Sequence, residues 1–146
     1  MLDENAYKST YDEVVWLSCP FEKAILSRCA DCDQAHKFNI AEREAVACEA
    51  AMARENCLTL HGLLRQNAAF ALKLLHPGEP LPHAKEMKIQ CGGLLGTQRL
   101  VDPEAMAAGN IHALVGEIQA RFGSMRELPY HEVVKAIAAY EGRRRR

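Results

Sequence analysis

The sequence predicts an all-α protein, a four- to five-helix bundle built on a long antiparallel helical hairpin with one long Gly/Pro-rich crossover loop. Helix start signals recur along the 146 residues, strand signals are nearly absent, and one long stretch is rich in Ala, Leu, Glu and Arg, which are strong helix formers. A chain of this length is expected to form one domain with its own core. We therefore predict a single helical domain over residues 1–142, followed by a basic tail, 143–146.

Two of the predicted helices lie near the N-terminus. Thr10 is followed three residues later by Glu13, a spacing typical of a capping box, and this pair predicts a short first helix. Pro20 suits the first position of a second helix, which would run over residues 20–35 with Cys19 as its N-cap.

The third predicted helix is the longest and completes the hairpin. Asn39 with Glu42 repeats the N-cap pattern and opens a helical stretch over residues 40–75, which ends before Pro77. A connection of about four residues at 36–39 implies that this helix folds back antiparallel on the helix before it.

The second half of the chain contains a long loop and two further predicted helices. Residues 76–101 hold several prolines and glycines without a convincing period, so we predict a long ordered loop with one short helix at most. A helix then begins at Asp102 and ends at Gly123, and the last helix runs from near Pro129 to Gly142.

Charge and hydropathy indicate which partners to expect. The formal net charge is −1, and without the four arginines Arg143–Arg146 the body is mildly acidic, with no basic stripe of the kind that follows a phosphate backbone. We therefore expect a protein partner and no nucleic acid. The sequence has neither a secretory signal nor the roughly 18 uninterrupted apolar residues of a membrane span. We expect a cytoplasmic protein with reduced thiols.

Six cysteines in a reducing compartment favour metal binding, redox chemistry or simple burial over a disulfide framework. On a helical wheel Cys29 and Cys32 project from one face of the second predicted helix, and Cys48 lies on the inward stripe of the next helix. At a rise of about 1.5 Å per residue the hairpin brings these three thiols to a common level. The same rise puts Cys19 and Cys57 on a second level about 15 Å away, outside one small metal centre.

A tetrahedral zinc ion or a cubane cluster needs a fourth ligand. Cys91 is the natural candidate, because the glycines that follow it in "IQCGGLLG" permit close approach, and His36 is the runner-up. We prefer an iron–sulfur cluster over zinc, because structural zinc usually sits in two compact C-x2-C knuckles, whereas a cluster tolerates scattered ligands. Such a centre would serve electron transfer or redox sensing. The predicted metal ligands are Cys29, Cys32, Cys48 and Cys91.

Three alternatives compete with the metal centre. The cysteines can be small buried core residues; the protein can be a metal-free helical adaptor that docks on a larger partner; or Cys19 can be the nucleophile of an enzyme. A thioredoxin-like dithiol is disfavoured, because Cys29 and Cys32 fall near the C-terminal end of their predicted helix beside two aspartates, where a thiolate is not stabilised. No motif in the sequence forms a catalytic constellation, so an enzyme is not our expectation.

Overall fold

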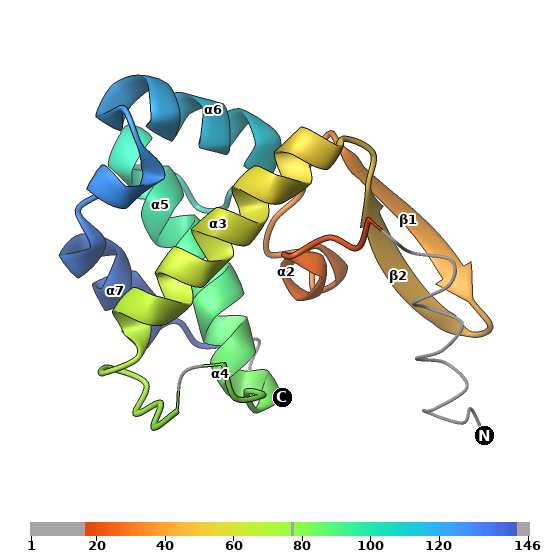
Figure 1. The fold of residues 1–146 in the computed structure, drawn as a ribbon, viewed down its shortest axis with the longest axis horizontal. Coiled ribbons are helices and arrows are strands. Elements are labelled where there is room, and N and C mark those ends of the chain that lie inside the picture. Colours follow the sequence, from red (N-terminus) through yellow and green to blue (C-terminus); the bar gives the residue numbers. More distant parts are fainter. Residues whose placement is uncertain (1–16, 77, 143–146) are drawn as a thin grey trace.

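A computed structural model describes residues 17–76 and 78–142 of the protein and combines helices with one small antiparallel sheet (Figure 1). The prediction of an all-α bundle is therefore wrong. The first half of the described chain contains a short helix and two strands, α2 (Glu22–Leu26), β1 (Ala35–Ile40) and β2 (Arg43–Cys48). The two strands form a hairpin that extends away from the helical body in Figure 1.

The hairpin occupies residues that the sequence predicts to be the connection at 36–39 and the beginning of the helix over residues 40–75. Ile40 stands opposite Arg43, so a two-residue connection joins the strands, and its first residue, Ala41, has φ of 55°. Gly or Asn usually occupies such a position, so this turn has no signature in the sequence. The strands are stabilised instead by burial of Ala45 and Val46, which are fully enclosed.

Helices make up the rest of the described chain. The predicted long helix over residues 40–75 is reduced to its central part, because the hairpin takes the beginning and an irregular segment takes the end. These elements are α3 (Ala51–Ala68), α4 (His83–Met87), a π-helical turn (Lys88–Gly92), α5 (Gly93–Val101), α6 (Ile111–Phe122), a 3-10 turn (Met125–Glu127) and α7 (Tyr130–Ala139).

The predicted crossover loop over residues 76–101 is a second correction, because the chain is helical without a break from His83 to Val101. The glycines that suggested a loop are places where helices approach closely. A Cβ on Gly92 would lie 2.8 Å from the backbone of Ile137, and a Cβ on Gly96 would lie 2.9 Å from the Cβ of Ala136. Glycine at these positions lets α5 and the π-helical turn pack against α7.

The last two predicted helices are present with different starts. The helix predicted from Asp102 begins at Ile111, and it ends as predicted at Gly123, whose φ of 81° suits glycine. The final helix follows Pro129 as predicted. The predicted capping box at Thr10 and the basic tail lie outside the described residues.

One large core joins the hairpin base to the helices. Phe21 and Val46 from the first part of the chain share it with Leu60 of α3, Leu94 of α5 and Ile137 of α7. No helix within residues 17–76 and 78–142 has the length and apolar character needed to cross a membrane.

Candidate metal centre

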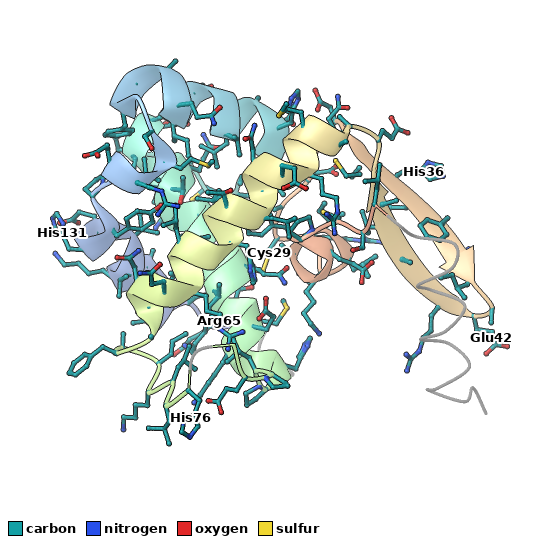
Figure 2. All side chains as sticks on the ribbon, viewed as in Figure 1. Cys29, His36, Glu42, Arg65, His76 and His131 are labelled. Atoms are coloured by element: carbon teal, nitrogen blue, oxygen red, sulfur yellow. A yellow bond between two sulfur atoms is a disulfide. The ribbon has the colours of Figure 1, made fainter. Side chains whose placement is uncertain are left out.

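The structure divides the four predicted metal ligands into two groups. Cys29 and Cys91 form a disulfide, with 62 residues of sequence separation and 5.9 Å between their Cα atoms. Cys32 and Cys48 remain free thiols. The runner-up, His36, lies on the exposed part of the hairpin, where its Nδ1 is 3.8 Å from Glu49 Oε1 (Figure 2).

Cys29 and Cys32 separate because the chain between them is extended rather than helical. Ala30 bridges Ala108 in the parallel sense, the N–H of Asp31 donates to the carbonyl of Ala108 at 3.1 Å, and the carbonyl of Asp31 accepts the N–H of Ile111 at 2.8 Å. In an extended chain, residues three apart point to opposite sides, whereas in a helix they share a face. Cys29 therefore reaches Cys91, and Cys32 faces the other way.

The four free cysteines, Cys19, Cys32, Cys48 and Cys57, line one small cavity. Cys19 precedes α2 and is held by its N–H, which donates to the carbonyl of Val46 at 3.0 Å. Cys48 is the last residue of β2, and Cys57 lies in the second turn of α3. Cys32 comes from the extended segment before β1. Four segments of the chain thus each place one thiol at the same cavity.

The cavity is predominantly apolar. Pro20, Phe21 and Ile111 contribute to its wall, and its free space is about 10 Å³, roughly that of one water molecule. Three polar residues also border it: Gln34, Arg54, whose Nε donates to the carbonyl of Ser18 at 2.8 Å, and the exposed His112.

Burial makes the neutral thiol the favoured form at three of these cysteines. Desolvation raises the pKa of Cys19 and of Cys57 to about 12, and it raises the pKa of Cys32 above its usual value. The neighbouring thiols add to this effect, since each disfavours a negative charge on the others. A thiolate in this cavity therefore needs a positive charge nearby.

Backbone N–H groups already point at two of the sulfurs. The N–H of Phe21 donates to Cys19, and the N–H groups of Gln34 and His112 donate to Cys32, each lowering the pKa of the thiol that accepts it. The N–H of His112 belongs to the first turn of α6, where the helix dipole also favours negative charge. In contrast, the thiol of Cys48 donates to the carbonyl of Ala50 at 3.2 Å.

As the side chains stand, no group of three or more His, Cys, Asp or Glu residues within the described ranges could hold one metal ion. Around a tetrahedral zinc ion, with Zn–S of about 2.3 Å, the sulfurs lie about 3.8 Å apart. A cubane cluster binds each thiolate through a different iron atom and keeps the sulfurs farther apart. The thiols must therefore move inward to bind an ion, whereas a cluster requires the walls of the small cavity to move outward.

The sequence prediction placed Cys32 and Cys48 near each other but left out Cys19 and Cys57. It excluded them by counting helical rise along a hairpin of helices, and that hairpin consists of strands in the structure. Cys19 lies beside β2 because residues 18 and 47 form an antiparallel bridge. A prediction that the residues around Ser18 pair antiparallel with β2 would have placed Cys19 at the cavity.

The described residues define a small protein of mixed helix and strand with four free thiols around one apolar cavity. Comparison of the chain with protein-family models, with curated proteins and with solved structures finds no match.

Proposed function

We propose that the protein holds a thiolate-ligated metal centre, an iron–sulfur cluster in preference to zinc, whose ligands are Cys19, Cys32, Cys48 and Cys57. The observation that carries this proposal is the gathering of all four free cysteines, from four separate segments, around one cavity. The ligand set replaces Cys29 and Cys91 of the sequence prediction, since the disulfide occupies both of those sulfurs.

The chemistry of the cavity supports a metal more than plain burial. A buried cysteine that acts only as a small hydrophobe needs no N–H donor, yet the sulfurs of Cys19 and Cys32 each accept at least one. Donors of this kind stabilise thiolates, and a bound metal cation would supply the positive charge that offsets the desolvation of the buried thiolates. Four cysteine ligands suit both tetrahedral zinc and a cubane cluster.

The preference for a cluster depends on where the ligands come from. All four cysteines border one cavity, whose free space of about 10 Å³ must widen to admit a cluster. The ligands also come from separate segments and not from two C-x2-C knuckles. A cluster in this position would take one electron from a reduced protein partner and pass it to an oxidised one. We place this activity in the cytoplasm, as the sequence predicts, but the expectation that all thiols are reduced is wrong, because Cys29 and Cys91 form a disulfide.

Metal analysis of the full chain, purified without oxygen, tests the proposal. We expect iron and acid-labile sulfide in the wild-type protein, with the visible absorbance of a cluster. Cys32→Ser and Cys57→Ser should lose most of the metal, whereas the Cys29→Ser/Cys91→Ser control should retain it. Circular dichroism verifies that every variant is folded. If the protein contains zinc without iron, the preference for a cluster is wrong. If all variants contain the same amount of metal as the wild-type protein, the proposed ligand set is wrong.

A metal-free adaptor is the second candidate function, and exposed apolar side chains favour it. Phe70 is 96% exposed and Leu75 is 80% exposed, both just beyond the end of α3. Exposed apolar side chains of this size often contribute to protein interfaces. If the folded wild-type protein contains no metal, and Cys32→Ser and Cys57→Ser leave its stability unchanged, the adaptor is the better description.

A further inference from the structure

We propose that the Cys29–Cys91 disulfide is a site of thiol–disulfide exchange with a small thiol that carries carboxylate groups. The proposal concerns the two cysteines outside the four-thiol cavity and does not depend on a metal there. It is based on an open hollow beside Cys29, on the charges that line the hollow, and on the different exposure of the two cysteines.

The hollow has a volume of about 440 Å³, within the range of small-molecule sites. Cys29 lies in its wall together with its neighbours Arg28 and Ala30. Cys29 is half-buried, whereas Cys91 is 2% exposed and does not border the hollow. An incoming thiolate therefore reaches the sulfur of Cys29 and not that of Cys91.

The charges around the hollow favour an anionic reagent. Arg28 and Lys37 both line it, both are exposed, and neither forms an ion pair with another residue that the structure describes. Asp31 is the acidic residue in the lining, and its Oδ1 accepts the N–H of Cys32 at 2.8 Å. Arg28 and Lys37 thus place two cations at the space that a carboxylate-bearing thiol would fill.

Arg28 also has an unusual backbone conformation. Its φ is 66°, in the left-handed region that favours glycine. A non-glycine residue in this region is strained, and such positions are concentrated at functional sites. The conformation lies one residue before Cys29, where the chain turns out of α2 into the extended segment.

The exchange has a defined balance. The thiolate of the small molecule attacks Sγ of Cys29, a new S–S bond forms, and the bond to Cys91 breaks, so that the electron pair leaves on Cys91. The proton that the small thiol gave up ends on Cys91, which becomes a neutral thiol. A second small thiol then attacks the mixed disulfide, which releases an oxidised dimer of the reagent and leaves two protein thiols. No other oxidant or reductant takes part.

Ser27 is positioned to help the leaving sulfur. Its Oγ lies 3.7 Å from Sγ of Cys91 and donates to the carbonyl of Ala24 at 3.1 Å. When the disulfide opens, the hydroxyl can turn its proton toward the Cys91 thiolate, which is otherwise buried among apolar groups. Ser27 is thus a positioning residue for the exchange.

Glutathione and the uncharged thiol 2-mercaptoethanol, applied to the oxidised full chain, test the proposal. The reaction is quenched with acid, and the mixed disulfide is located by peptide mass analysis. We expect the adduct on Cys29. The ratio of the glutathione rate to the mercaptoethanol rate should fall about three- to tenfold in Arg28→Gln/Lys37→Gln, as expected for the loss of two exposed charge contacts. Lys23→Gln, which removes a lysine outside the hollow, is the matched control and should leave the ratio unchanged.

Ser27→Ala separates positioning of the leaving group from reagent binding. It should lower the exchange rate with glutathione and with mercaptoethanol by the same factor, so the ratio of the two rates stays as in the wild-type protein. An adduct on Cys91, or a rate ratio that is the same in wild type and in Arg28→Gln/Lys37→Gln, would overturn the proposal. Because no metal is measured, these results are independent of the outcome for the four-thiol cavity.

Discussion

Reduction of the Cys29–Cys91 disulfide should destabilise the folded protein by about 4 kcal/mol. The bond closes a loop of 62 residues of sequence separation. In the chain-entropy treatment of disulfides, a loop of this length restricts the unfolded chain by about 14 cal/mol/K, which is about 4 kcal/mol at room temperature. The bond joins the end of α2 to the π-helical turn, and so connects the cysteine-rich half of the chain to the helical half.

Urea unfolding followed by circular dichroism measures this effect. With a denaturant dependence of about 2 kcal/mol/M, the loss of about 4 kcal/mol lowers the unfolding midpoint by about 2 M when a phosphine reductant is added. Cys29→Ser/Cys91→Ser is the control, and it should unfold near the midpoint of the reduced wild-type protein both with and without the reductant. The control also reveals any effect of the reductant on the four free thiols.

A midpoint that is unchanged by reduction of the wild-type protein would refute the reasoning. The two halves of the chain would then be held together by packing alone, and loop closure would add nothing to stability. If the reductant shifts the unfolding midpoint of Cys29→Ser/Cys91→Ser by the same amount, the loss of stability comes from the other cysteines and not from this disulfide.

Two further predictions follow from packing and from the half-buried pair of His61 and Glu86. Gly92→Ala places a methyl group 2.8 Å from the Cα of Ile137 and should destabilise the protein by about 1–3 kcal/mol. Gly62→Ala in α3 meets open space and should stabilise the protein by about 0.5–1 kcal/mol. If both variants shift the urea midpoint of the wild-type protein in the same direction, this prediction is wrong. Burial raises the pKa of Glu86, but hydrogen bonds from His61 at 2.6 Å and Gln90 at 2.9 Å outweigh it and hold that pKa below its usual value. This carboxylate therefore stabilises the fold above its unfolded-state pKa of about 4.3, and the contribution is lost as the pH falls through the lower folded-state value. Glu86→Gln should cost about 1–2 kcal/mol at neutral pH and progressively less below about pH 4.3, and a pH-independent difference in unfolding free energy would argue against the ion pair.

The sequence predicted the C-terminal elements better than the N-terminal ones. Gly123 and Pro129 are local signals, and the structure ends and begins helices at these positions. The hairpin has no comparable signal, because Ala41 stands where a turn of this kind usually has Gly or Asn. The Ala- and Glu-rich residues around it favour a helix locally, and the burial of Ala45 and Val46 favours strands.

The candidate site was predicted in part for the same reason. The sequence places Cys32 and Cys48 at one level of the fold, and both line the cavity in the structure, but the helical period also assigns Cys29 to their face. The pairing of Cys29 with Cys91 depends on tertiary structure, since cysteine connectivity cannot be deduced from a single sequence. Cys57 lines the same cavity as Cys19 because α3 follows directly after β2, a strand where the sequence predicted a helix.

The extended segment between Cys29 and Cys32 makes the two proposed sites neighbours in sequence but separates them physically. Ala30 and Asp31 are fixed to residues 108 and 111 by backbone hydrogen bonds, and the N–H of Asp33 donates to Oδ1 of Asn110 at 3.2 Å. These bonds hold the Cys32 end of the segment to the start of α6 without help from the disulfide. Opening the disulfide therefore frees Cys29 toward the hollow while Cys32 keeps its place at the cavity. The two proposals together therefore predict that the Cys29→Ser/Cys91→Ser variant loses stability but not metal.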